Sequence, residues 1–248
     1  MNRPVTQTIE KMSEYQELIQ TIALTMGVAW ASGINLYATL ALLGLGGATG
    51  YVDLPPPLEI LQDPMIILCA GFMYCVEFMA DKIPGVDTGW DALHTFIRIP
   101  VGAMLAFGAA GDVTPGIAVT AGILGGSVSA ATHAIKSGTR VLINTSPEPF
   151  SNWGASIIED LLVFAGLWAV LQHPVLFLLA FAVFLLALCW LLPKLLHRVA
   201  IVCKKLGTWL GLVRDAMPDR EMNLKALADA GVLTDTEYRN ARMRLTSS

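Results

Sequence analysis

Long apolar runs separated by prolines and glycines dominate the chain from about residue 21 to residue 193. The run 175–192 contains no charged residue and is long enough to cross the hydrocarbon core of a bilayer as one helix. Five further apolar runs carry glycine or charge: about 21–48, 64–82, 88–110, 114–143 and 153–172. This pattern predicts an all-α, polytopic membrane domain at 21–193 with about six transmembrane helices, several of them broken by glycine or proline.

Amphipathic segments flank this domain on both sides. In residues 1–20, Ile9, Met12 and Tyr15 recur at helical spacing, which predicts an amphipathic helix at the membrane interface. Pro193 is expected to end the last span. The basic segment 194–218 either lies along the inner leaflet or extends the last helix, and packing between copies in a homo-oligomer explains both amphipathic patterns equally well.

Residues 219–248 form a separate polar unit. Thr234 and Glu237 have the spacing of a capping box, and Gly231 suits the end of a preceding helix, so the pattern predicts a small cytosolic hairpin of two helices. The run L-x-x-L-x-x-A-G-V-L-T-D-x-E-Y resembles the short C-terminal (SHOCT) module of many bacterial proteins. That resemblance implies oligomerisation or docking of a cytosolic protein partner.

Composition and charge narrow the class further. A mean hydropathy of +0.59 is too high for an ordinary soluble domain. The chain contains no basic block suited to nucleic acid, and we expect no cofactor. The loops 49–63, 111–115 and 172–174 lack Lys and Arg, whereas Lys194 and Arg198 follow the last span closely. By the positive-inside rule, six spans then place both termini in the cytoplasm.

Ionisable residues inside the apolar runs fall on stripes of single helices. A charge at the bilayer centre costs roughly 2.5–3.5 kcal/mol even on lenient scales, so these side chains need partners or water. The stripes follow helical spacing: Asp87, Asp91, His94 and Arg98; Ser129, His133, Lys136, Arg140 and Asn144; Glu77 and Asp81; and Asn152, Ser156 and Glu159. We expect the four polar faces to turn inward, where acids either pair with bases or line a wet cavity.

The leading functional hypothesis is a channel or transporter that moves an ion or small polar solute through this charged interior. The candidate pathway residues are Asn35, Glu77, Asp81, Asp87, Asp91, His94, Arg98, His133, Lys136, Arg140, Asn144, Glu159 and Asp160. Their acids would attract cations or carry protons, and their bases would neutralise the acids or hold an anion. Asp87, Asp91 and His94 are also candidate ligands of a divalent metal.

Three alternatives stay open at this point. The charged residues could be purely architectural and hold broken helices together. The protein could be a membrane enzyme that handles lipid phosphates, although the sequence contains no nucleophile motif, which favours a protein that is not an enzyme. It could also be a membrane scaffold that acts through residues 219–248. Membrane lipids are expected partners under every one of these hypotheses.

Several strings together resemble one known family. They are S-G-I-N-L-Y-A-T, G-Y-V-D-L-P, V-E-F-M-A-D-K-I-P-G-V-D, W-D-A-L-H-T-F-I-R and K-S-G-T-R-V-L-I-N-T-S-P-E-P-F-S-N-W. They are similar to a bacterial membrane family classed as a domain of unknown function, number 4126, over roughly residues 25–170. The resemblance implies a helical protein of the bacterial inner membrane, and it brings no activity and no catalytic residues.

Overall fold

The protein is mostly helical in the part that the structure, a computed structural model, describes: residues 3–111, 113–145, 150–210 and 216–246, with only the backbone for 3–10, 216–222 and 246. It divides into two compact units, Met1–Val199 and Ala200–Ser248. Five helices are each long and apolar enough to cross a membrane, and a bent pair brings the number of candidate spans to six. The all-α polytopic fold predicted from the sequence is confirmed.

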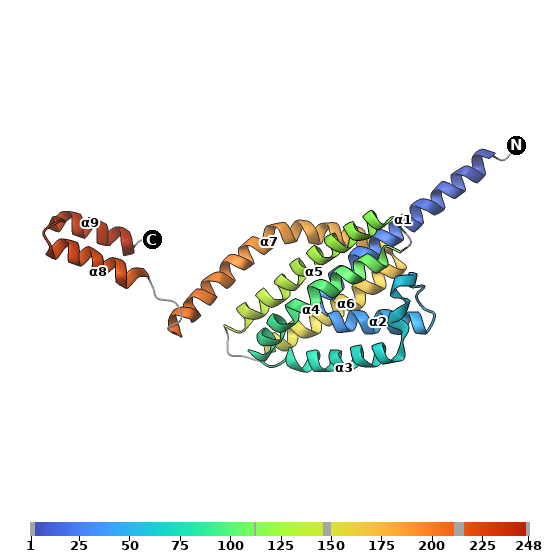
Figure 1. Ribbon diagram of the computed structural model, residues 1–248, viewed down its shortest axis with the longest axis horizontal. Coiled ribbons are helices and arrows are strands. Elements are labelled where there is room, and N and C mark those ends of the chain that lie inside the picture. Colours follow the sequence, from blue (N-terminus) through green and yellow to red (C-terminus); the bar gives the residue numbers. More distant parts are fainter. Residues whose placement is uncertain (1–2, 112, 146–149, 211–215, 247–248) are drawn as a thin grey trace. The chain divides into compact units, whose positions relative to one another are not determined.

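The first unit contains a bundle of helices connected by short turns (Figure 1). In chain order its elements are α1 (Arg3–Ile34), α2 (Leu36–Ala48), the 3-10 helix η1 (Pro56–Gln62), α3 (Pro64–Ala80), α4 (Val86–Ala109), α5 (Pro115–Ile143), α6 (Phe150–Gln172) and α7 (Pro174–Trp209). Helices α4 and α5 pack along each other, and α1 packs against both of them. The bent pair is η1 with α3, which meet at an angle of 70°.

The segment predicted as a first span at 21–48 is not one crossing. Asn35 interrupts it with an extended backbone (φ −142°, ψ 98°), and its side chain accepts a hydrogen bond from the Ala38 amide, which starts α2. Thr21 in α1 and Val52 after α2 line the same pocket, so the chain returns to the end of the bundle from which it came. Hydropathy alone cannot distinguish such a re-entrant pair from a kinked span.

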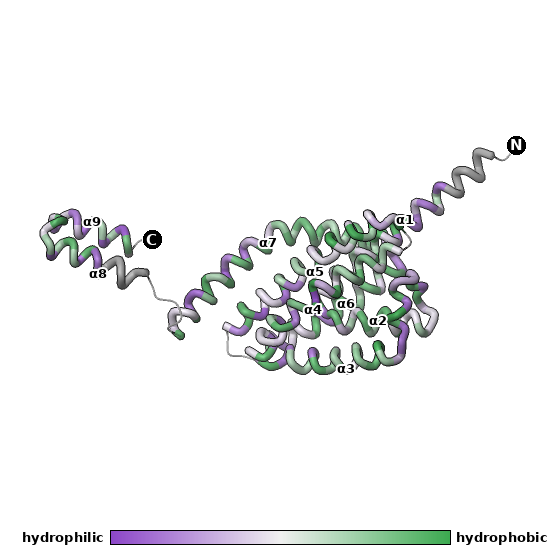
Figure 2. The backbone as a smooth tube through the Cα atoms, in the orientation of Figure 1, coloured by the Kyte–Doolittle hydropathy of each residue, from purple (hydrophilic) through white to green (hydrophobic). Residues whose placement is uncertain are grey.

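The helices extend across both ends of the predicted membrane domain. The amphipathic segment 1–20 is continuous with the first apolar helix, because α1 runs unbroken from Arg3 to Ile34. Pro193 lies inside α7, which continues to Trp209, so the basic segment after it begins as an extension of the last helix, one of the two alternatives given for it. Beyond this proline Leu195 is buried and packs on Gly138 of α5, so tertiary contact favours continued helix despite the lost hydrogen bond. Much of α3 and of the first half of α7 is strongly hydrophobic (Figure 2).

Small residues let α1, α4 and α5 approach closely beside the break in the first helix pair. A Cβ atom added at Gly102 of α4 would lie 2.5 Å from the Ser129 hydroxyl oxygen and 2.8 Å from that of Ser32. A Cβ added at Gly33 would lie 2.6 Å from the Ser129 carbonyl oxygen. Close approach of this kind replaces the hydrophobic driving force that is missing between helices in lipid.

The second unit contains the end of α7 and a hairpin of α8 (Ala216–Asp229) and α9 (Asp235–Thr246). The predicted capping box is confirmed: Glu237 Oε2 accepts from the Thr234 amide at 2.9 Å and from its hydroxyl at 2.7 Å. These hydrogen bonds to the ionised form lower the pKa of Glu237. The cap therefore stabilises α9 fully at pH values above the ordinary pKa of a glutamate. This contribution is lost as the pH falls through the lowered pKa of Glu237.

Substitution of Gly102 tests the close packing of α1, α4 and α5. We expect Gly102→Ala to destabilise the protein by about 1–3 kcal/mol, because neither Ser32 nor Ser129 has room to move away from the added methyl group. Gly89→Ala on the same helix is the matched control, since nothing lies within 4 Å of its Cβ position. Thermal unfolding in detergent should show a loss only for Gly102→Ala; equal stability of both variants would contradict the packing.

Candidate functional site

Seven ionisable side chains from α3, α4, α5 and α6 and from the residue that caps α3 meet inside the bundle. This charged cluster consists of Glu77, Asp81, Asp91, Arg98, Lys136, Arg140 and Glu159. All of them are buried except Glu159, whose side chain is 15% exposed. The prediction that the polar faces turn inward, acids toward bases, is confirmed for these residues.

Lys136 of α5 lies at the centre of the cluster. Its ammonium group donates hydrogen bonds to Glu77 Oε1 at 2.9 Å and to Asp81 Oδ2 at 3.0 Å. Carboxylate oxygens of Glu159 and Asp91 lie 3.6 Å and 3.8 Å from the same nitrogen. One cation therefore faces four acids, so its removal would leave several buried negative charges without compensation.

Arg98 of α4 joins the cluster to the break in the first helix pair. Its Nη2 donates to Glu77 Oε1, while its Nη1 donates to the Ile34 carbonyl at 2.7 Å and lies 3.4 Å from the Gly33 carbonyl. The last carbonyls of a helix have no intrahelical partner and carry partial negative charge. The end of α1 thus acts as a further acceptor for a buried cation, and the helix break is chemically part of the cluster.

Arg140 of α5 ties the cap of α3 to α6. Its Nη1 donates to the backbone carbonyls of Asp81 at 3.1 Å and Asn152 at 3.0 Å, and its Nη2 donates to Glu159 Oε2 at 2.6 Å. Charge-assisted bonds of this length are the stronger class of hydrogen bond in proteins. Arg140 therefore fixes the relative positions of α3, α5 and α6 on this side of the cluster.

Asp91 differs from the other acids of the cluster. It is completely buried, and neither of its carboxylate oxygens has a hydrogen-bond partner among the residues that the structure describes. The nearest cationic nitrogens, Arg98 Nη2 and Lys136 Nζ, lie 3.7 Å and 3.8 Å from Oδ1. A buried carboxylate with ion-pair neighbours but no hydrogen bond is the least satisfied member of the cluster.

A second polar group lies where α4 begins and α5 ends. Asp87 Oδ1 accepts from the backbone amides of Gly85 and Thr88 at 2.8 Å and 2.6 Å, and from Asn144 Nδ2 at 2.7 Å. Asn144 Oδ1 in turn accepts from Asn152 Nδ2 at 2.8 Å. These bonds hold the first turn of α4 and join it to the end of α5. The structure therefore places Asp87 and Asn144 beside the charged cluster rather than in it.

The remaining predicted pathway residues separate into two groups. Asp160 accepts from Asn35 Nδ2 at 2.9 Å and from the Tyr74 hydroxyl at 3.2 Å, which anchors the helix break to α3 and α6. His94 stacks on Trp90 and bonds that residue's carbonyl at 2.9 Å through Nδ1. It also packs edge-on against the Tyr37 ring, and among the described residues no ion pair joins it to the charged cluster, so packing explains its position.

His133 stays close to Asp91 through the backbone. Its Nε2 lies 2.8 Å from the Thr95 hydroxyl and 3.1 Å from the Asp91 carbonyl oxygen, and the Thr95 hydroxyl donates to that same carbonyl at 2.9 Å. The three groups form a compact hydrogen-bonded set on the α4–α5 contact. Among the described residues, no three His, Cys, Asp or Glu side chains are grouped so that they could hold a metal ion, and the metal site suggested for Asp87, Asp91 and His94 gains no support.

A polar pocket and an apolar layer lie above the cluster along the helices. A pocket of about 340 Å³ at the loop end of the bundle is lined by polar side chains that include Glu17, Gln20, Thr21, Asp53 and Gln172. Below it, Val28, Leu105 and Val163 belong to the main hydrophobic core. The order along α4, read from its C-terminal end, shows the layers. Ala109 lines the pocket, Leu105 lies in the core, and Arg98 lies in the cluster about two turns before Leu105 in the sequence. The apolar layer therefore separates pocket from charges.

Sequence reasoning missed the groups that complete the cluster. The carbonyls of Gly33 and Ile34 accept from Arg98 of the cluster, while the hydroxyls of Tyr74 and Thr95 bond Asp160 and His133 beside it. The string Ser32-Gly33-Ile34-Asn35 carried the clue to the broken backbone, since a small residue followed by a capping asparagine is typical of a helix break. The carbonyl of Asn152 had no counterpart in the sequence pattern, because its role follows only from the α5–α6 contact.

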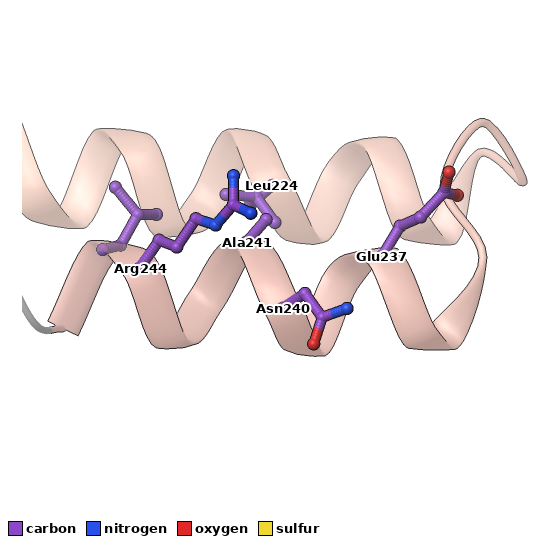
Figure 3. Close-up of a pocket in the computed structure, with 6 residues that line it drawn as sticks. Leu224, Glu237, Asn240, Ala241 and Arg244 are labelled. Atoms are coloured by element: carbon purple, nitrogen blue, oxygen red, sulfur yellow. The ribbon is translucent and has the colours of Figure 1, made fainter.

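A further pocket, of about 520 Å³, lies in the second unit between α8 and α9. Figure 3 shows Leu224 of α8 beside Ala241 and Arg244 of α9, with Glu237 and Asn240 along the same helix. Glu237 is already engaged in the helix cap. The pocket resembles the groove of any short helical hairpin, and the charged cluster of the first unit remains the candidate site.

Comparison with known proteins gives one match. A family described as Domain of unknown function (DUF4126) matches residues 22–194, which include every member of the charged cluster. Neither a curated protein nor a solved structure matches the chain. The family resemblance inferred from the strings is confirmed, whereas the SHOCT-like character of residues 219–248 stays a prediction, because the match ends before that unit.

Removal of the central cation tests the cluster. We expect Lys136→Gln to destabilise the folded protein by about 3–5 kcal/mol, since it leaves Glu77 and Asp81 buried without their shared donor. Lys194→Gln is the control, because Lys194 is exposed and its ammonium group lies over the Trp190 ring, outside the charged cluster. Unfolding in detergent should separate the two variants; similar stability would show that the cluster is not held by this ion pairing.

Proposed function

The chain belongs to the DUF4126 family, whose function is unknown, and on that premise we propose that the first unit moves an ion or small polar solute across the membrane through the charged cluster. The observation that carries the proposal is the excess of buried acid. Six carboxylates, of Glu77, Asp81, Asp87, Asp91, Glu159 and Asp160, are buried or nearly so, against three buried cations among the described residues. A purely architectural network has no need for such an imbalance.

The helix break supports the same proposal. Helix α2 has 13 residues, which span about 20 Å, so it is too short to cross a hydrocarbon core of roughly 30 Å. The re-entrant pair α1–α2 therefore brings backbone carbonyls without intrahelical partners to Arg98 inside the bundle. Irregular backbone at membrane depth is tolerated only where protein or a polar cavity surrounds it, and such breaks form the solute sites of many transporters.

The layers along the helices define the order in which a solute would meet different surroundings. A solute would meet the polar pocket with Glu17 and Asp53, then the apolar layer around Leu105, then the acids of the cluster. In the conformation described here the apolar layer closes the route from the pocket. Transport therefore requires this layer to open, as alternating-access mechanisms demand.

Orientation follows from the same geometry. Leu195 packs on Gly138, so Lys194 and Arg198, which flank it in α7, lie at the end of the bundle opposite the polar pocket. The positive-inside rule assigns that end to the cytoplasm. Because Glu17 and Thr21 of α1 line the pocket, we propose that the N-terminal part of the chain lies on the other face of the membrane. The proposal replaces the expectation that both termini are cytoplasmic.

Flux through reconstituted protein tests the function. We expect purified protein in liposomes to raise the flux of protons or monovalent cations above that of empty liposomes. Glu159→Gln removes the negative charge of the most exposed acid of the cluster, whose interaction with a passing cation is worth roughly 1.5–3 kcal/mol, so flux should fall about tenfold or more.

The control for that experiment is Glu59→Gln, an exposed acid on η1 outside the charged cluster and outside the residues that line the polar pocket. It should leave the flux unchanged. Liposomes that show only background leak for protons, sodium, potassium and chloride under every gradient would refute the transport proposal.

Labelling of single cysteines tests the orientation. In a variant without the native cysteines, Glu14→Cys on α1 and Arg198→Cys on α7 are both exposed. We expect an impermeant thiol reagent added outside intact cells to label position 14 and to leave position 198 untouched until the membrane is opened. Labelling of both positions from one side would contradict the re-entrant geometry of α1 and α2.

A further inference from the structure

We propose that the charged cluster binds one exchangeable proton, and that the proton resides on the carboxyl group of Asp91. The binding itself stands on the geometry of the cluster. The consequence that a proton is the ion moved, or is coupled to the ion moved, rests in addition on the proposed transport function.

Three of the four acids in the charged cluster are matched by hydrogen bonds from cations. Glu77 accepts from Arg98 and Lys136, and Asp81 accepts from Lys136 at 3.0 Å. Glu159 accepts from Arg140 at 2.6 Å. The hydrogen bonds that the three cations donate to carboxylates therefore all go to acids other than Asp91. Asp91, the fourth acid, has two cations at ion-pair distance but accepts no hydrogen bond from them.

Burial makes this remaining charge costly. The Asp91 side chain has no exposed surface, and neither of its oxygens accepts a hydrogen bond from a described residue. A carboxylate out of water without hydrogen bonds is unfavourable by several kcal/mol, and such groups usually take up a proton. With a proton on Asp91, the cluster holds three negative and three positive charges.

A proton fits this position better than a metal cation does. The Lys136 ammonium already lies 3.8 Å from Asp91 Oδ1 and 2.9 Å from Glu77 Oε1, so a metal bound by these acids would meet a positive charge at close range. Cations such as Na⁺ and Ca²⁺ need several oxygen ligands, whereas a proton needs only one. No group of three potential ligands suited to a metal is found among the described residues.

Charged and titratable groups face Asp91 from every helix packed around it. They are Glu77 from α3, Asp81 at the cap of α3, Arg98 from its own helix, His133 and Lys136 from α5, and Glu159 from α6. Uptake or loss of a proton at Asp91 therefore changes the field at each of them. Glu159, with the most exposed side chain of the charged cluster, is the natural member to exchange protons with the surroundings.

Infrared spectroscopy of the full chain in lipid bilayers tests the site. A protonated carboxyl group gives a C=O stretching band that is separate from carboxylate bands. We expect one such band at neutral pH, shifted by carbon-13 labelling of aspartate but not of glutamate, and lost in Asp91→Asn. Asp229→Asn, an exposed aspartate at the end of α8, is the matched control and should keep the band.

Each outcome of the experiment decides the proposal. Absence of the band in the wild type, its persistence in Asp91→Asn, or its displacement by sodium at constant pH would overturn it, the last in favour of a metal cation. If Asp91→Asn does not fold, isotope labelling of the wild type still tests whether the band belongs to an aspartate, because labelling needs no substitution. If the band is found as expected but liposomes show no flux, the proton site stands and the transport function falls.

Discussion

The sharing of one buried ammonium group between acids of different helices is the interaction on which the rest of the structure depends. Lys136 on α5 binds Glu77 on α3 and Asp81 at its cap, while Arg98 and Arg140 bind the same acids from either side. In lipid, helices gain little from burying apolar surface against each other. Ion pairs out of water supply the specificity instead, because any register that separates them leaves a bare charge.

The close helix packing and the helix break both serve this arrangement. Gly33, Gly102 and Ser129 allow α1, α4 and α5 to approach until the end of α1 reaches the Arg98 guanidinium. In turn, Arg98 satisfies carbonyls that the break leaves without intrahelical partners. The small residues and the charged residues are therefore parts of one solution. Loss of either would expose polar backbone at a depth where water is scarce.

Much of this could be predicted from the sequence, and the failures are instructive. The stripes of Asp91 and Lys136 indicated inward-facing charges correctly, because helical spacing fixes which residues share a face. The re-entrant pair was missed, because hydropathy shows only that 21–48 is apolar. It does not show that the chain turns back at Asn35. His94 shares the stripe of Asp91, yet it stacks on Trp90 of its own helix, which spacing could not indicate. Spacing identifies a face but not a partner.

The cluster is held unevenly, and this unevenness supports the proposed conduction site over a purely structural brace. Glu77 accepts two charge-assisted hydrogen bonds and is completely buried, so changing its state would disturb three helices at once. Asp91 accepts none, and Glu159 accepts one while retaining some exposure. A network built only for stability would satisfy its members alike. Here the firmly bound acids set the positions of the helices, and the loosely bound ones can change protonation without dismantling them.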